Sequence, residues 1–205
     1  MRYIVITGDL VGSSKLLDRG KVQTQVKATL HKMNRLFRQD IVVGFAFSGG
    51  DEFQGLVKLG DKVFALLKEF QKQLYPVKAY FGIGYGEIST PIAKTTVEMD
   101  GECFHNSRKA IEYAKKLHQE IVFITGNEEK NTILNTVLQL ISAIKSSWND
   151  IHYRRIWKYE ELNTLEQVAE KEAVSLRAIS KTLQDAKYDA IRNAEDFICQ
   201  ELTLK

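Results

Sequence analysis

The sequence is poor in cysteine and in proline, and it has no long apolar run. It contains two cysteines and two prolines in 205 residues. Cys103 and Cys199 lie far apart, which excludes a zinc motif built on closely spaced cysteines. No window approaches the roughly 18 apolar residues that a membrane span needs, and no basic, apolar leader precedes the first strand-like run. We therefore expect a cytoplasmic protein in a reducing setting, without a membrane partner.

The charges are nearly balanced, and the formal net charge is +3. That value is too small to indicate a protein whose surface binds nucleic acid mainly through its positive charge. Residues 1–125 carry 18 basic and 13 acidic side chains, whereas residues 126–205 carry 11 basic and 13 acidic ones, a net −2. The apolar content of 44% is enough for one large domain or two small ones. We expect two domains, residues 1–126 and 127–205.

A tight turn with two acids lies at residues 48–53, between two apolar runs. Such runs joined by a Gly-rich connection predict a β-hairpin, in which Gly49 and Gly50 supply positive φ without steric cost. Asp51 and Glu52 would lie at its tip. Acids at a tip are often only solvated turn formers. However, a second acid, Asp9, has a similar setting.

A buried strand that ends in an acid can place that acid at the sheet edge, facing a ligand. Asp9 has this position, because it ends the apolar run of residues 2–9. The turn that follows would present backbone N–H groups and hydroxyls to phosphate at the start of a helix, from Leu10, Gly12, Ser13 and Ser14. Alternatively, Ser13 or Ser14 is only the N-cap of that helix. The spacing is not that of a Walker P-loop.

Helical and strand periodicities alternate over the first 125 residues. Helices are predicted at 15–38, 61–74 and 101–118, and strands at 2–9, 41–47, 53–57, 77–88 and 120–125. This order predicts an α+β fold, a ferredoxin-like (palm-like) domain with helices on one face of a largely antiparallel sheet. Gly82, Gly84 and Gly86 recur at period two, which favours close packing of a helix over close approach of a ligand.

In a split βαβ sheet the first and third strands are neighbours, so the carboxylates of Asp9 and Asp51 can converge. Paired oxygen ligands beside a phosphate-binding turn suit Mg²⁺ or Mn²⁺ carrying a nucleoside triphosphate. Two such metal ions would activate a hydroxyl and stabilise the leaving pyrophosphate. We expect Asp9 and Asp51 to bind metal, and Glu52 to assist them in catalysis.

Four segments resemble the class III nucleotide cyclases and the diguanylate cyclases, which share a palm-like fold. Residues 8–14 resemble the first metal motif of the class III enzymes, residues 49–53 spell the Gly-Gly-Asp-Glu-Phe signature of the diguanylate cyclases, and residues 81–87 and 100–110 are similar to two further class III motifs. The resemblance implies a homodimer, because class III cyclases often build sites at a dimer interface. More narrowly, the whole chain resembles the SatD family, in which such a domain precedes a helix-turn-helix.

The resemblance also implies nucleotide contacts at Asn106, Arg108 and Lys109, but the pattern departs from that of the cyclases. Asn106 and Arg108 are two residues apart rather than four, and Phe47 stands where a base-selecting Lys is usual. The metal ligands are retained, whereas the base and transition-state contacts are not. Binding of a purine nucleoside triphosphate is therefore better supported than its cyclisation.

Residues 164–183 resemble a helix-turn-helix and follow a helix predicted at 131–148. Small Ala169 would let two helices cross closely, and Ser175 would cap the second helix, with Ala173 where Gly is usual. In the major groove of double-stranded DNA the second helix would present Ser175, Leu176, Arg177, Ser180 and Lys181. The alternative is a helical hairpin for packing or dimerisation, which the net charge of −2 favours.

Three functions follow from these observations. The main hypothesis is a regulator in which a metal-dependent nucleotide-binding domain biases a DNA-binding helix-turn-helix. The alternative is a homodimeric cyclase or hydrolase of ATP or GTP, in which the C-terminal half serves dimerisation. In the third, the acids are vestigial and the domain is a binding scaffold.

Overall fold

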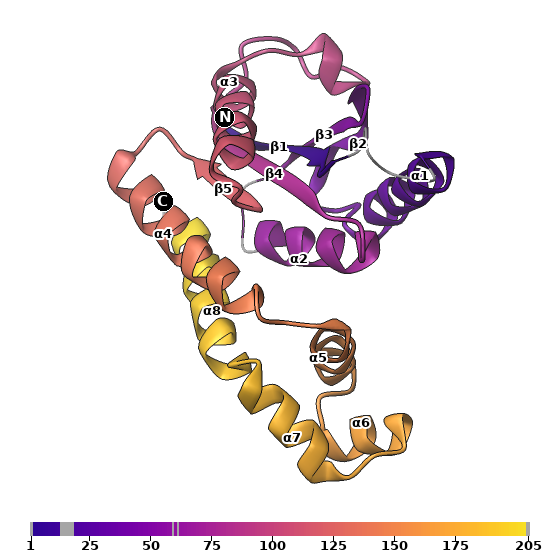
Figure 1. Cartoon of the computed structure of the whole chain (residues 1–205). Coiled ribbons are helices and arrows are strands. Elements are labelled where there is room, and N and C mark those ends of the chain that lie inside the picture. Colours follow the sequence, from indigo (N-terminus) through magenta and orange to yellow (C-terminus); the bar gives the residue numbers. More distant parts are fainter. Residues whose placement is uncertain (1, 13–18, 59, 61, 204–205) are drawn as a thin grey trace. The chain divides into compact units, whose positions relative to one another are not determined.

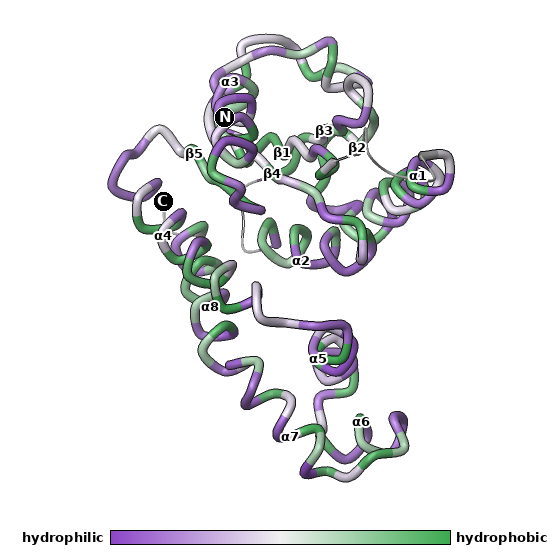
Figure 2. The backbone as a smooth tube through the Cα atoms, viewed as in Figure 1, coloured by the Kyte–Doolittle hydropathy of each residue, from purple (hydrophilic) through white to green (hydrophobic). Residues whose placement is uncertain are grey.

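The computed structural model of the chain describes residues 2–12, 19–58, 60 and 62–203 (Figure 1). The chain divides into two compact units, residues 1–138 together with 199–205, and residues 139–198. Hydrophilic and hydrophobic residues alternate along the helices, as Figure 2 shows, so the helices are amphipathic. Among the described residues, no helix is both long enough and apolar enough to cross a membrane.

The first unit is built on a five-stranded sheet with the strand order β2-β3-β1-β4-β5. Along the chain its elements are β1 (Arg2–Leu10), α1 (Arg19–Leu36), β2 (Ile41–Gly49), β3 (Glu52–Val57), α2 (Lys62–Leu74), β4 (Ala79–Glu87), η2 (Thr96–Glu98), α3 (Glu102–Leu117) and β5 (Ile121–Ile124). Neighbouring strands are antiparallel except β4 and β5, which are parallel. The first four strands have the order of a ferredoxin-like sheet. The predicted α+β fold is confirmed.

Helices cover both faces of this sheet, whereas the sequence analysis expected them on one. Successive strand residues point to opposite faces. On one face Phe81 packs on Phe70 of α2, with ring centroids 5.7 Å apart, and on the other Gly82 and Gly84 lie against α3. The expectation of one covered face is wrong, because the connection of residues 88–101 carries the chain to the glycine side of β4 before α3 begins.

The glycines of β4 let the backbone of α3 lie directly on the sheet. A Cβ atom added to Gly82 would lie 2.3 Å from the backbone nitrogen of Ile111, and one added to Gly84 would lie 2.1 Å from that of Ser107. These are backbone atoms, which cannot turn aside as the end of a side chain can. Close helix packing, the favoured explanation of the glycine spacing, is confirmed at these two positions.

An asparagine side chain pairs with the backbone of each edge strand. Asn34 of α1 donates from Nδ2 to the carbonyl of Phe45 at 3.0 Å and accepts its N–H at 2.7 Å, on β2. Asn135 makes the same two bonds with Phe123 of β5, at 2.9 Å and 2.8 Å. Because an open edge exposes unpaired backbone groups, these bonds satisfy the edge and tie α1 and α4 to the sheet.

The second unit is helical. It contains α5 (Asp150–Leu162), α6 (Leu165–Glu172) and α7 (Leu176–Asp185), together with parts of α4 (Glu128–Lys145) and α8 (Tyr188–Thr203), which each have residues in both units. Neither α5 nor α8 is among the predicted elements. The side chain of Asn149 caps α5 by accepting the N–H groups of Ile151 and His152 at 3.0 Å and 3.2 Å.

Residues 173–175 connect α6 to α7 in a sharp turn. Val168, Ala169 and Ile179 form a buried cluster between the two helices. Ser175 caps α7, because its Oγ accepts the N–H of Ala178 at 3.2 Å. Ala173 has a φ of 53°, in the left-handed region where a helix usually ends in glycine. The expected roles of Ala169 and Ser175 in packing and capping are confirmed.

The contact between α3 and β4 generates a first prediction. We expect Gly84→Ala to lower the free energy of unfolding by about 3 kcal/mol, the top of the usual overpacking range, because the new methyl group meets backbone. Gly49→Ala is the matched control, since Gly49, unlike Gly50, does not have the expected positive φ, and a Cβ there has nothing within 4 Å. Urea unfolding followed by far-UV circular dichroism measures both variants. Equal stability of the two would contradict the packing argument.

Candidate functional site

An acidic pair lies at one end of the sheet, where β1 and β3 are neighbours. In the antiparallel register Asp9 of β1 is opposite Glu52 of β3, and Asp51 precedes Glu52 in the hairpin turn. Residues directly opposite each other point to the same face, with Cβ atoms about 5 Å apart. The predicted adjacency of the first and third strands is confirmed, and Glu52 is the hairpin acid that the register places opposite Asp9.

Lys115 of α3 forms an ion pair with Asp9. Its Nζ lies 2.6 Å from Oδ2 of Asp9, whose side chain is 17% exposed, while that of Lys115 is 42% exposed. Lys115 is not among the residues expected from the sequence, because 106 positions separate it from Asp9. The predicted helix at 101–118 could have indicated this lysine, because a helix of that length crosses the sheet and ends over one end of the strands.

A buried polar chain lies behind Asp9 on the same face. Thr7 precedes Asp9 by two residues and shares a 2.7 Å hydrogen bond with Ser107 of α3. Gln54 of β3 donates to the Thr7 hydroxyl at 3.0 Å, and Ser107 donates to the carbonyl of Gly82 at 2.9 Å. Because these bonds join three strands and α3, they fix the strand ends that carry the acids.

The acids could hold a Mg²⁺ or Mn²⁺ ion only together with other ligands. Among the described residues there is no group of three or more histidine, cysteine or acidic side chains that could hold a metal alone. Mg²⁺ commonly binds one or two carboxylates and completes its shell with substrate phosphates and water. Asp9 and Glu52, with Asp51 beside them, supply that kind of partial shell.

The predicted phosphate turn is described only in part. The Leu10 side chain is buried at 4% exposure, so only the backbone of this residue is available to a ligand. Gly12 has a φ of 65°, and a Cβ there would meet nothing within 4 Å. Ser13 and Ser14 lie outside the described residues.

The predicted nucleotide contacts on α3 lie away from Asp9. Asn106 donates its Nδ2 to the carbonyl of Tyr85 at 2.8 Å, and Tyr85 is opposite Ile4 in β1. Ile4 is five residues from Asp9, or about 17 Å along a strand. Arg108 and Lys109 are exposed on the outer side of α3. One copy of the chain therefore does not bring Asn106 and Asp9 together.

The predicted DNA-contacting residues share the outer side of α7. Ile179 and Thr182 form its buried side. Ser180 is half-buried, and the other four are exposed: Ser175, Leu176, Arg177 and Lys181. Residues 176–184 carry two cations and no acid.

Cations of α5 hold Glu172, the last residue of α6. Arg154 donates from Nη2 to Oε2 of Glu172 at 2.8 Å and from Nε to both oxygens, and Lys158 donates to Oε1. The Glu172 side chain is 6% exposed. Burial raises the pKa of this carboxyl, but hydrogen bonds from Lys158 and Arg154 outweigh burial and hold the pKa below its ordinary value. The cluster fixes the end of α6, where the turn to α7 begins.

These features define a two-part protein. Its α+β domain has a ferredoxin-like sheet with acidic residues at the ends of β1 and β3, and its second part is a helical unit. The chain belongs to the SatD family, which it matches over residues 3–194. A search of curated proteins finds no match.

Two solved structures are similar to the chain. One is described as a bacterial light-regulated adenylyl cyclase; it is 13% identical with a TM-score of 0.47, and the match covers 60% of this chain and 74% of that one. The other is described as a regulator of polyketide synthase expression from Bifidobacterium adolescentis; it is 10% identical with a TM-score of 0.30, over 98% of this chain and 84% of that one. Both scores are low, so the fold assignment rests on strand order and register.

The Glu172 cluster gives a second prediction, on acid stability. Because the folded pKa of Glu172 is depressed, its stabilisation is present above the unfolded pKa of about 4.5 and is lost as pH falls through the folded value. We expect Glu172→Gln to cost about 2 kcal/mol at pH 7, less than a fully buried pair because Arg154 is half exposed, and to flatten the loss of stability below pH 4.5.

Tryptophan fluorescence during urea unfolding measures this effect selectively, because Trp148 and Trp157, the two tryptophans of the chain, both lie in the helical unit. Glu170→Gln is the control, since Glu170 is an exposed acid on the same helix. A Glu172→Gln profile that parallels the Glu170→Gln profile at every pH would show that the cluster does not stabilise the unit.

Proposed function

We propose that the chain is a regulator whose first unit binds a purine nucleoside triphosphate through Mg²⁺ or Mn²⁺. The observation that carries the proposal is the register that sets Asp9 opposite Glu52, beside Asp51. The two carboxylates on adjacent strands would form an incomplete metal shell, which phosphate oxygens would complete. When bound, the metal would neutralise phosphate charge, while Asp9 and Asp51 hold the metal and Glu52 assists.

Lys115 supports an exchange mechanism for this binding. In the chain alone its ammonium neutralises Asp9 at 2.6 Å. A divalent cation at Asp9 would displace Lys115, because the two positive charges repel each other. The displaced ammonium would then lie near the phosphates, together with the backbone of the turn at Gly12. Metal alone should therefore bind weakly, and metal with nucleotide should bind more tightly.

A second copy of the chain is the proposed source of the remaining contacts. Asn106 and Asp9 are separated along β1 and α3 within one copy, so a site that uses both requires a dimer. The class III cyclases, which the chain resembles, often build sites at a dimer interface. Arg108 and Lys109, exposed on α3, would then face phosphate across that interface.

The third prediction tests the metal site by thermal shift with ATP or GTP, with and without Mn²⁺. A ligand at about 100 times its Kd adds roughly 2.7 kcal/mol, which moves the midpoint by a few degrees. We expect Asp9→Asn and Asp51→Asn to lose the metal-dependent shift while keeping the unliganded midpoint. Lys115→Met should increase the shift with Mn²⁺ alone, because Asp9 loses its competing cation.

Asp196→Asn, which changes an exposed acid of the helical unit, is the control for this series. A shift retained in Asp9→Asn would refute the site. Release of pyrophosphate or phosphate in the same samples would favour the alternative, a cyclase or hydrolase. Light scattering of the nucleotide-bound sample tests the homodimer.

The helical unit is proposed to bind double-stranded DNA through α7. The supporting observation is that its exposed side combines two cations with small and polar residues, and that its first turns carry no acid. Arg177 and Lys181 are the two cations of α7. The cations Arg154 and Lys158 of the neighbouring helix α5 already bind Glu172. The net negative charge of residues 126–205 favours the alternative, a helical hairpin for packing or dimerisation, so phosphate contacts would have to come from this one helix.

The fourth prediction concerns the salt dependence of that binding. Each phosphate contact contributes roughly 0.9 to the slope of log K against log salt. We expect Arg177→Ala and Lys181→Ala each to lower the slope by about 1 and to weaken binding of a duplex measured by fluorescence anisotropy. Lys94→Ala, at an exposed lysine outside the helical unit, is the control. Unchanged slopes would indicate a helical hairpin for packing or dimerisation instead.

A further inference from the structure

The strand register places Tyr80 beside the acidic pair. In the antiparallel pairing of β1 with β4, Tyr80 is opposite Asp9, just as Glu52 is opposite Asp9 in the pairing of β1 with β3. Residues directly opposite each other point to the same face of a sheet. Gly82, two residues further along β4, lies against α3 on that face. Glu52, Asp9 and Tyr80 therefore form one row of side chains across three strands, on the face that α3 covers.

Tyr80 holds the imidazole of His118. The Tyr80 hydroxyl and Nδ1 of His118 share a hydrogen bond of 3.2 Å. The Tyr80 ring is half-buried against Ala110, Ala114 and Val122, so packing fixes the position of its hydroxyl. His118 itself is exposed. An exposed imidazole would otherwise rotate freely, and the fixed hydroxyl orients it.

The second nitrogen of this imidazole lies near the cation of the acidic edge. His118 follows the end of α3 directly, three residues after Lys115, and side chains at this spacing on a helix are neighbours. Among the described residues the imidazole has no hydrogen bond except that with Tyr80, so Nε2 remains for a ligand. When the hydroxyl donates to Nδ1, the imidazole proton is on Nε2 and can be donated to an oxygen atom.

An anion at this end of α3 needs side-chain donors. The C-terminus of a helix carries a partial negative charge, which repels phosphate. The N–H of His118 donates to the carbonyls of Ala114 and Lys115, and the last turn carries the cations Lys115 and Lys116. Phosphate would therefore be bound here through side chains and not through the helix end.

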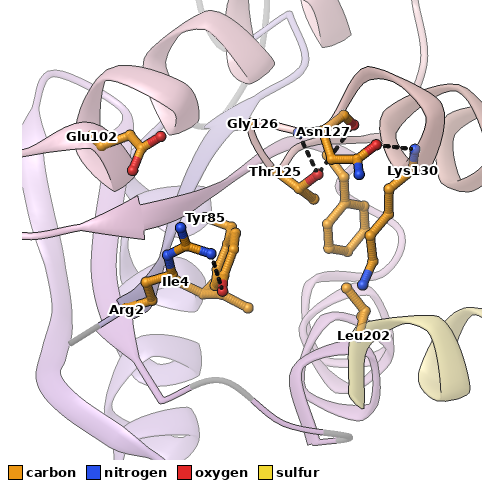
Figure 3. A pocket seen from close by; sticks show the side chains of 10 residues that line it. Arg2, Ile4, Tyr85, Glu102, Thr125, Gly126, Asn127, Lys130 and Leu202 are labelled. Atoms are coloured by element: carbon orange, nitrogen blue, oxygen red, sulfur yellow. Dashed lines mark hydrogen bonds between the residues drawn. The ribbon is translucent and has the colours of Figure 1, made fainter. Parts of the chain in front are cut away.

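The Tyr80–His118 pair is separate from the cavity of about 280 Å³ in the first unit, which Figure 3 shows. Tyr85 of β4 lines that cavity, whereas neither Tyr80 nor His118 does. Five residues of strand separate the two tyrosines, about 17 Å, and an odd separation places their side chains on opposite faces of the sheet. The pair therefore belongs to the acidic edge.

We propose that His118 donates a hydrogen bond from Nε2 to the phosphate chain of the nucleotide at the acidic edge, and that Tyr80 positions the imidazole for this contact. The contact rests on the proposed function, since the metal at Asp9 would bring the phosphates to this end of the sheet. Lys115, displaced from Asp9, and His118 would bind the same phosphate chain. The contact recognises phosphate and is independent of the base.

The fifth prediction compares ATP with inorganic tripolyphosphate, which has the phosphate chain and no base, by isothermal titration calorimetry of the full chain with Mn²⁺. We expect His118→Asn to weaken both ligands at least about fivefold and by the same factor, because one hydrogen bond to a charged group is lost. Asparagine tolerates the left-handed φ of 53° at this position, so the end of α3 is kept. His31→Asn, the same change at an exposed histidine of α1, should leave both Kd values unchanged.

A double-mutant cycle tests the positioning role of Tyr80. Tyr80→Phe keeps the ring and removes the hydroxyl. We expect it to weaken tripolyphosphate about threefold in the otherwise wild-type chain and to have no further effect when combined with His118→Asn. A hydroxyl with a merely structural role would weaken binding equally in both backgrounds.

The possible outcomes separate this contact from the proposed function. Binding of both ligands to the wild type with unchanged Kd values in His118→Asn would overturn the contact and leave the proposed function intact. A loss confined to ATP would also overturn it, because the imidazole would then contact the nucleoside. If the wild type bound neither ligand in the presence of Mn²⁺, the proposed function would be refuted and the contact with it.

Discussion

The packing of α3 on the glycines of β4 is the constraint on which both ends of the first unit depend. Because Gly82 and Gly84 have no side chains, the helix backbone lies directly on the strand, and its position along the strand is fixed by Ser107 and Thr7. Lys115, near the end of the helix, then reaches Asp9, while Glu102, at its beginning, accepts the N–H of Glu87 at the end of β4. Thirteen residues of helix separate the two, about 20 Å.

Hydrogen bonds from helices to strand ends complete this frame. One asparagine side chain from a helix pairs with backbone groups of each edge strand, Asn34 with β2 and Asn135 with β5. These bonds attach α1 and α4 to the two edges of the sheet. Asn135 also places α4 beside β5. The position of the acids depends on strand register, which Thr7 and Gln54 hold through their hydrogen bond.

Much of this architecture is predictable from local patterns. Apolar periodicity fixes the order of the strands and helices, and Asp9 and the 49–53 turn can be recognised because acids rarely end apolar runs beside glycines. Lys115 cannot be found in this way, since a surface lysine on a helix has no distinguishing spacing. The packing of α3 on the second face of the sheet is not predictable either, because residues 88–101 have no periodicity that indicates on which face the next helix lies. Glu172 appears as one of many acids until α5 is folded against it.

The ion pair between Lys115 and Asp9 links the structure to the proposed exchange of cations. A carboxylate that is 17% exposed loses much of its hydration, and a partner charge offsets that loss. Lys115, at 42% exposure, can leave toward solvent with little rearrangement, whereas Asp9 is fixed in a central strand. In the proposed exchange the acid would therefore stay in place while its cation changes. Such an arrangement would respond to metal and phosphate together more strongly than to either alone, because only their combination replaces the charge of Lys115 and gives its ammonium a new partner.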